Sequence, residues 1–223
     1  MEDRGWWESF QTYLEFRYDE VLALAIEHIW VVLISVALAT IVGVGLGVAV
    51  YRTARPRELV LAVCGTLLTI PSLALFGLFV TIPGLGLGAR SVVLALVLYG
   101  LLPIVRNTIV GLLSVDAAVV ESAQGMGMGR AQRLLRVELP LAWPVILTGM
   151  RVSTLIIIGI AAIGAYINGP GLGDLIFTGL ARIGGANALN EVLAGTLGVI
   201  VLAILFDLVY AVFGRVTIPK GIR

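Results

Sequence analysis

Five long apolar stretches dominate this 223-residue sequence and limit what it can fold into. A helix needs about 20 predominantly apolar residues to cross the roughly 30 Å hydrocarbon layer of a bilayer, and each stretch is long enough. Charged residues make up 13% of the chain, about half the share typical of soluble domains. The sequence therefore predicts an all-α integral membrane protein surrounded by lipid, with about five transmembrane helices. We expect these spans near residues 29–50, 59–80, 91–113, 145–167 and 192–213.

The two ends of the chain differ in composition from this membrane domain. Residues 1–24 begin with a polar, acidic run, unlike a signal peptide, which needs a basic start and an apolar core. Aromatic rings suit the headgroup level of a bilayer, and this segment offers Trp6, Trp7, Tyr13 and Tyr18. We therefore expect an interfacial segment outside the cytoplasm over residues 1–24, a membrane domain over 25–215 and a cytoplasmic tail over 216–223.

The basic residues predict the orientation of the spans, because Lys and Arg collect in cytoplasmic loops. With five spans, Arg4, Arg17, Arg90 and Arg182 lie on one side of the membrane. The other 11 of the 15 Lys and Arg residues lie on the opposite side: Arg52, Arg55, Arg57, Arg106, Arg130, Arg133, Arg136, Arg151, Arg215, Lys220 and Arg223. We therefore expect the N-terminus outside, and the C-terminus and the loop 114–144 in the cytoplasm.

The loop 114–144 has the pattern of a short helix followed by a turn. Asp116 can cap a helix start, since its carboxylate can accept a hydrogen bond from a free backbone N–H. Residues 117–124 are mostly good helix formers. Three glycines at alternate positions then disfavour a continuous helix: Gly125, Gly127 and Gly129.

A second helix is expected from near Arg130 back into the membrane. Pro140 and Pro144 lie in its polar-to-apolar transition, where proline kinks or restarts a helix. A short helix next to the membrane exit suits docking into the groove of a partner protein.

The same loop carries a spaced pattern: Glu121-Ser122-Ala123, three residues, Gly127, nine residues, then Val137-Glu138-Leu139-Pro140. This pattern resembles the E-A-A, three residues, G, nine residues, I-x-L-P signature of importer permeases of the ATP-binding-cassette class. It departs from that signature at Ser122 and Val137. In that family the loop forms a coupling helix that inserts into a cleft of the ATPase subunit. An isolated Glu121 would indicate only a solvated helix face, so the spacing as a whole carries the resemblance.

With the helix cap and the turn glycines included, the ATPase-coupling loop is expected to use Asp116, Glu121, Ser122, Ala123, Gly125, Gly127, Gly129, Leu139 and Pro140. The resemblance implies a type I, methionine-importer-like permease fold in a larger complex. Its partners would be ATPase subunits that bind ATP and magnesium, a second permease copy or paralogue, and an extracytoplasmic solute-binding protein. This chain has no nucleotide-binding motif, so we expect neither a cofactor in it nor enzyme activity. Its net charge of +1 gives no case for nucleic acid.

Four further segments resemble permeases of the osmoprotectant branch: Ile70–Leu78, Leu98–Thr108, Glu121–Arg151 and Ile167–Leu180. The resemblance implies import of glycine betaine, carnitine, choline or proline. Quaternary amines are usually held in aromatic cages, and the outer-end aromatics here form no recognisable one, so the substrate rests on the resemblance. A permease for methionine or another amino acid is the alternative.

Six residues are candidates for the solute path or its gate: Pro71, Ser72, Asn168, Gly169, Pro170 and Gly171. A proline inside a membrane helix is tolerated where it lines a cavity or is buried in protein, so Pro71 indicates either the path or a packing kink. The run that starts at Asn168 is either a gate or an ordinary outer loop. Gly43, Gly45 and Gly47 lack the strand and the Lys-Ser/Thr of a phosphate loop and predict close helix packing instead.

Asp207 is the only acid well inside a span, and such residues are usually paired or functional. We expect an ion pair with Arg151 or Arg106; a gating or proton-transfer role is the alternative. His28 has no other His or Cys beside it, and Cys64 lies alone in an apolar run, so we expect no metal site.

Two other classes of membrane protein predict different sequences. An ion-coupled secondary transporter would be expected to show several intramembrane carboxylates or internally repeated, broken spans, and only Asp207 fits. A non-transporting membrane subunit would have no need of a glycine-punctuated docking loop.

Overall fold

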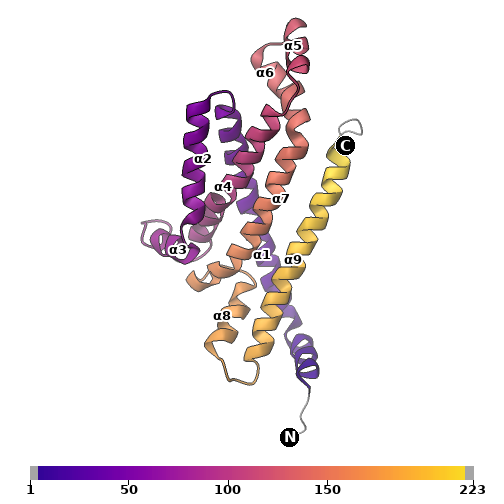
Figure 1. Cartoon of the computed structure of the whole chain (residues 1–223). Coiled ribbons are helices and arrows are strands. Elements are labelled where there is room, and N and C mark those ends of the chain that lie inside the picture. The colour runs from indigo at the N-terminus through magenta and orange to yellow at the C-terminus, as the bar shows by residue number, and fades with distance from the viewer. Residues whose placement is uncertain (1–4, 219–223) are drawn as a thin grey trace. The chain divides into compact units, whose positions relative to one another are not determined.

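The computed structural model describes residues 5–218, which fold into helices without a strand. The predicted all-α class is confirmed (Figure 1). In chain order the elements are α1 (Trp6–Val50), α2 (Ala54–Thr69), α3 (Ser72–Val80), α4 (Ala89–Leu113), α5 (Ala117–Gly125), α6 (Arg130–Arg133), the π-helix η1 (Leu134–Glu138), α7 (Leu139–Gly164), the 3₁₀-helix η2 (Ala165–Ile167), α8 (Gly173–Ala181) and α9 (Ala188–Thr217).

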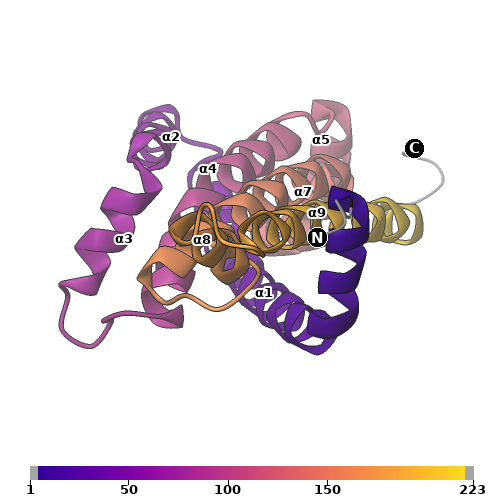
Figure 2. The ribbon, with the colours of Figure 1, turned by 90° about the horizontal axis from the view of Figure 1, so that it is seen from below.

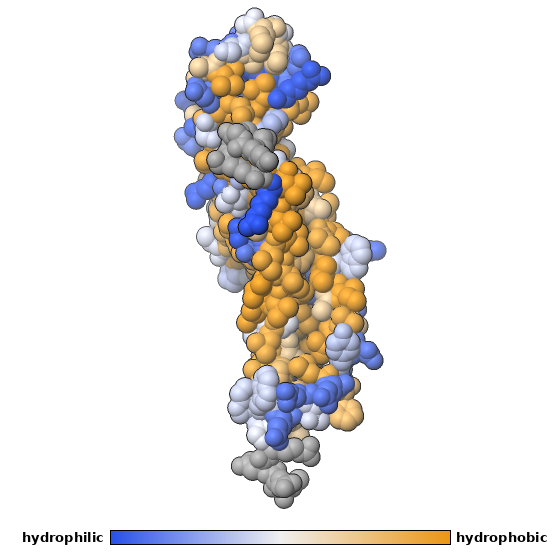
Figure 3. Space-filling model, turned by 90° about the vertical axis from the view of Figure 1, so that its right-hand side faces the viewer, coloured by the Kyte–Doolittle hydropathy of each residue, from blue (hydrophilic) through white to orange (hydrophobic). Residues whose placement is uncertain are grey.

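Four helical runs are long and apolar enough to cross a membrane: Trp6–Val50, Ala89–Leu113, Arg130–Ile167 and Ala188–Thr217. The pair α2 and α3 makes a fifth if it counts as one broken span. Apolar side chains cover much of the exposed surface seen in Figure 3. The prediction of about five spans is therefore confirmed.

The expected boundary near residue 24, between an interfacial segment and the first span, is absent from helix α1. It is one continuous helix of 45 residues, about 68 Å long at 1.5 Å per residue, and so exceeds the hydrocarbon layer by more than a factor of two. Residues 6–42 contain no Gly or Pro, the residues that most strongly interrupt helices. The polar N-terminal segment therefore extends the first span as the same helix, while residues 1–4 and 219–223 lie outside the described part of the chain.

The second predicted span, expected as one helix near residues 59–80, is broken into two, because α2 ends at Thr69 and α3 starts at Ser72. Pro71 has no N–H to donate and disfavours helical geometry at the residue before it. Its backbone is extended, with φ −58° and ψ 132°, and it stands directly before α3. Pro71 therefore divides the apolar stretch into two helices.

The chain forms two compact units. The first consists of Met1–Ser35, Ile70–Leu96 and Ile156–Phe206, and the second of Val36–Thr69, Val97–Leu155 and Asp207–Arg223. In the first unit a core forms around Phe10, Tyr13, Leu172, Leu175, Ala194 and Leu202. The core of the second unit is built from Val50, Tyr51, Cys64, Leu101, Val105, Ile109, Leu112, Ala142 and Ile146.

Small residues bring the helices of the second unit close together. A Cβ on Gly43 would lie 2.8 Å from Ile104, and one on Gly47 would lie 2.7 Å from Thr108. A Cβ on Gly45 would meet nothing within 4 Å. Gly111 of α4 packs in the same way on Ala142 of α7, and the two helices lie side by side (Figure 2). Gly43 and Gly47 thus serve the close packing that the sequence predicts, whereas Gly45 does not.

Candidate functional site

Helix α5 begins where the sequence predicts the short loop helix. The Asp116 carboxylate accepts a hydrogen bond from the backbone N–H of Ala118 at 2.8 Å. At the other end, Gly127 has φ +83°, a left-handed conformation that glycine adopts without steric cost. The Met128 N–H reaches back to the carbonyl of Ala123 at 3.2 Å. The result is a nine-residue helix closed by a tight turn.

Most of this loop is exposed. Ala123 is buried, whereas Glu121, Ser122, Gly125, Gly127 and Gly129 are exposed. Exposed apolar side chains accompany them, with Val119 on α5 and Met126, 71% exposed, in the turn. A helix and turn that project apolar side chains into solvent have the character of a protein-binding surface.

The return to the membrane is helical throughout. Pro140 lies in the first turn of α7 and Pro144 lies inside that helix, so neither proline interrupts it. The departure from α geometry comes earlier, in the π-helical turn η1, Leu134–Glu138. A proline cannot donate to the carbonyl four residues before it and its ring crowds that carbonyl, so the irregular turn falls immediately before Pro140.

The charged centre of this region is Glu138, which is only 3% exposed. Its carboxylate accepts hydrogen bonds from the Tyr51 hydroxyl at 2.6 Å, from Arg52 Nη2 at 2.8 Å and from Arg133 Nε at 3.1 Å. Arg133 Nη1 also donates to Gln124 of α5 at 3.2 Å. This Glu138 cluster therefore joins α5, the η1 turn directly before α7 and the turn that follows α1.

The protonation of the Glu138 cluster follows from its burial. Burial raises the pKa of the Tyr51 hydroxyl, and its hydrogen bond to the Glu138 carboxylate raises it further. Tyr51 therefore stays protonated at neutral pH and donates its hydrogen. Buried charges are tolerated when they are paired and hydrogen-bonded, and here two guanidinium groups and a phenol satisfy one carboxylate.

A second charged pair lies within the spans. Arg151 of α7 donates to Asp207 of α9 through Nε at 2.5 Å and Nη2 at 2.6 Å, a bidentate arrangement. The side chains remain 44% and 36% exposed, respectively. Arg106, on α4, is exposed and lies outside this pair. Of the two partners that the sequence allows for Asp207, the structure selects Arg151.

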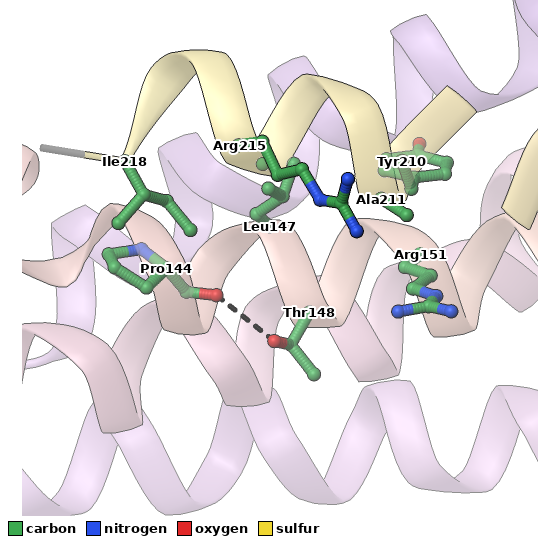
Figure 4. A pocket seen from close by; sticks show the side chains of 9 residues that line it. Pro144, Leu147, Thr148, Arg151, Tyr210, Ala211, Arg215 and Ile218 are labelled. Atoms are coloured by element: carbon green, nitrogen blue, oxygen red, sulfur yellow. Dashed lines mark hydrogen bonds between the residues drawn. The ribbon is translucent and has the colours of Figure 1, made fainter. Parts of the chain in front are cut away.

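A groove of about 310 Å³ runs beside this pair between α7 and α9 (Figure 4). Its polar lining comes from Thr148 and Arg151 on α7 and from Tyr210 and Arg215 on α9. The Tyr210 hydroxyl lies 2.8 Å from the hydroxyl of Thr154, a contact that fixes its aromatic ring.

The candidate gate residues Asn168–Gly171 form a tightly packed turn in the first unit. Asn168 has φ +58° and Gly171 has φ +121°. A Cβ on Gly169 would lie 2.6 Å from the carbonyl oxygen of Gly164, and one on Gly171 would lie 2.8 Å from His28 Nδ1. Gly88 donates its N–H to the carbonyl of Ile167 at 2.8 Å. Close backbone approach therefore requires these glycines, and the Asn168–Gly171 turn is anchored to α1 and to the start of α4.

Pro71 and Ser72 are separate from that turn in sequence and mark the start of α3. Helix α3 contacts η2, the element directly before Asn168. His28 is fully buried, and its Nε2 lies 3.2 Å from the carbonyl oxygen of Ile158. His28 therefore packs tightly against the Asn168–Gly171 turn within the first unit.

The described geometry is that of a helical membrane protein with an exposed, partly apolar loop between two of its long helices. Residues 29–218 match the family described as "Binding-protein-dependent transport system inner membrane component". Because the match covers most of the chain, the chain belongs to this family of multi-pass membrane transport proteins.

Two curated relatives align over nearly the whole chain. The glycine betaine/carnitine/choline transport system permease protein OpuCB of Bacillus subtilis (strain 168) is 39% identical over 215 residues, which cover 96% of each chain. The osmoprotectant import permease protein OsmW of Salmonella typhimurium is 41% identical over 204 residues, covering 90% of this chain and 93% of that protein. The resemblance to importer permeases of the osmoprotectant branch is therefore confirmed.

The fold is similar to a solved transporter. An inward-facing structure of the MetNI methionine ABC transporter matches with a TM-score of 0.78 at 20% identity, covering 88% of this chain and 95% of that chain. The predicted methionine-importer-like permease fold is confirmed.

Proposed function

We propose that this chain is the permease of an ATP-driven importer for small quaternary amines, such as glycine betaine, carnitine and choline. The observation that carries the proposal is the identity of about 40% with permeases named for these solutes, over nearly the full length of the chain. The chain supplies the membrane path, while ATP and magnesium bind to a separate ATPase.

In this proposal the α5 loop is the coupling element. Val119 and Met126 are exposed on it and would enter a cleft of the ATPase, while Asp116 and Gly127 hold the shape of helix and turn. Leu139 and Pro140 form the first turn of α7, so a displacement of the loop would reach the membrane helix through continuous backbone.

The Glu138 cluster would transmit that displacement. Arg133 hydrogen-bonds both Gln124 of α5 and Glu138, and Glu138 hydrogen-bonds Tyr51 and Arg52 in the turn after α1. These elements would therefore move as one body when the ATPase subunits close on ATP.

The complex would contain two permease chains, identical or paralogous, and a solute-binding protein on the outer side. The N-terminus would lie outside and the C-terminus in the cytoplasm, in agreement with the excess of Arg and Lys in the loops on that side. Asn168–Gly171 would belong to the outer end of the path, as would Pro71 and Ser72.

Uptake by the reconstituted complex tests this function. The chain, its ATPase and its binding protein are placed in proteoliposomes, with ATP inside and labelled glycine betaine or methionine outside. We expect ATP-dependent uptake of glycine betaine that unlabelled choline or carnitine reduces. Uptake of methionine in place of glycine betaine would contradict the proposed substrate. Uptake driven by an ion gradient without ATP would contradict the proposal that the transporter is ATP-driven.

A further inference from the structure

The Arg151–Asp207 pair lies where a membrane protein seldom exposes charge. Asp207 is about 15 Å from the end of α9 at Thr217, and Arg151 is about 18 Å from the start of α7 at Leu139, at 1.5 Å per residue. Both positions are deep within apolar spans. An ionised group at such a depth usually faces a bundle interior or a water-filled cavity.

Lipid tails cannot satisfy this surface. Both side chains are more than a third exposed, and hydrocarbon offers neither hydrogen bonds nor a high dielectric constant. The neighbouring faces of α9 are different, because Ile204, Leu208 and Val209 are each at least half exposed and wholly apolar. Lipid suits those faces, whereas the face with the ion pair needs water, solute or protein.

The groove beside the pair offers groups that match a zwitterionic amine. Arg151 and Arg215 line the groove with planar guanidinium groups, which recognise carboxylates. Asp207, the ion-pair partner of Arg151 beside the groove, presents a negative charge for an ammonium group. The Tyr210 ring lines the same groove, and a tyrosine face attracts quaternary ammonium through cation–π interaction. Thr148 adds a hydroxyl at the groove's α7 wall.

We propose that the α7–α9 groove beside Arg151 and Asp207 is a solute-contact surface of the translocation path for zwitterionic quaternary amines. Arg151 meets the solute carboxylate, and Asp207 and Tyr210 meet the ammonium group. This inference rests on the proposed function. Because the two side chains neutralise each other between passages, the surface holds the solute weakly, as a path must for release.

Substrate preference provides the first test, with the ATPase and binding protein present. Glycine betaine has a carboxylate and choline does not, so Arg151→Gln should lower the ratio of glycine betaine to choline uptake by about tenfold, the effect of roughly 1.4 kcal/mol in transition-state binding. Arg106→Gln removes the same charge from an exposed position outside the groove and should leave the ratio unchanged. An equal ratio in wild type and Arg151→Gln overturns the inference.

The accessibility of position 148 in the groove provides the second test. It distinguishes a solute-contact surface from a lipid-facing groove and from an interface between two permease chains. In a chain with Cys64→Ala, Thr148→Cys is treated with trimethylammonium-ethyl methanethiosulfonate, a membrane-impermeant quaternary amine. We expect modification that glycine betaine slows several-fold, and none at Val209→Cys on the apolar face. Lack of modification, or an oxidative cross-link between Thr148→Cys residues of two copies, would assign the groove to lipid or to a permease interface. Wild-type uptake of glycine betaine would still stand in that case, so the two proposals fail separately.

Discussion

Two charged clusters in the second unit have opposite surroundings. Glu138 is almost fully buried and three side chains of the same chain donate to it. Arg151 and Asp207 form a bidentate pair with each other and remain more than a third exposed. The first cluster is complete within the chain and suits a structural role. The second leaves polar surface to another molecule, which is expected of a site that solute passes.

The difference also predicts which cluster should tolerate change. Removing one partner of a buried charge cluster leaves unpaired charge in a poorly hydrated place. Removing one partner of an exposed pair leaves a charge that water can reach. Substitutions should therefore divide into those that damage the fold and those that damage transport.

The largest expected effect is from Glu138→Ala. It leaves Arg133 buried without its carboxylate, and breaking a buried pair costs about 3–5 kcal/mol. Thermal unfolding of the purified chain in detergent should show a strongly lowered midpoint. Glu121→Ala, which removes an exposed carboxylate from the same region, is the matched control and should change the free energy of unfolding by less than about 0.5 kcal/mol. Equal midpoints for both variants would remove the structural role of Glu138.

Gly127→Ala should have the next largest effect. At φ +83° a Cβ costs about 1–2 kcal/mol, so the turn after α5 would distort and ATPase binding would weaken. Gly129→Ala is the control, because its φ is −66° and its surroundings are open. Co-purification of the ATPase with each variant measures the difference. Unchanged recovery with Gly127→Ala would show that the turn geometry does not matter for docking.

Asp116→Ala should weaken α5 by about 1 kcal/mol through loss of the N-cap hydrogen bond. Asp116→Ser keeps a capping oxygen and should retain most of that stability. Hydrogen exchange of the α5 amides reports the change locally, with faster exchange expected in the alanine variant alone. Identical exchange in the two variants would contradict a capping role.

The smallest effect on stability should come from Arg151→Gln. The pair is exposed, so its loss should shift the unfolding midpoint far less than Glu138→Ala does, although uptake of glycine betaine should fall. If the unfolding midpoint shifts as much as in Glu138→Ala, the Arg151–Asp207 pair contributes to stability like the Glu138 cluster, and the proposed distinction between the two is wrong.

Features of this chain that are set by local spacing could be predicted from its sequence. The spans follow from apolar length, and the short helix follows from Asp116 and the later glycines. The Arg151–Asp207 pair could be predicted because an acidic residue deep in a span is usually paired. The break at Pro71 could also have been predicted, since proline disfavours helical geometry at the preceding residue.

The Glu138 cluster depends on contacts that one sequence does not reveal. Tyr51 and Arg52 are 87 and 86 positions away from Glu138, and Glu138 occupies the variable position of the spaced loop pattern. Its one local signal was an acid immediately before Leu139 and Pro140, where the chain becomes apolar. The continuity of α1 likewise depends on packing of its N-terminal turns through Phe10 and Tyr13 in the first unit.

The most direct test of this account is a photo-cross-link from the α5 turn. A photoreactive phenylalanine analogue replaces Met126, the exposed apolar side chain of that turn, in cells that contain the ATPase and the binding protein. We predict a cross-link to the ATPase whose yield changes when ATP is trapped. A cross-link to the extracytoplasmic binding protein would place the loop on the outer side of the membrane and contradict the coupling role.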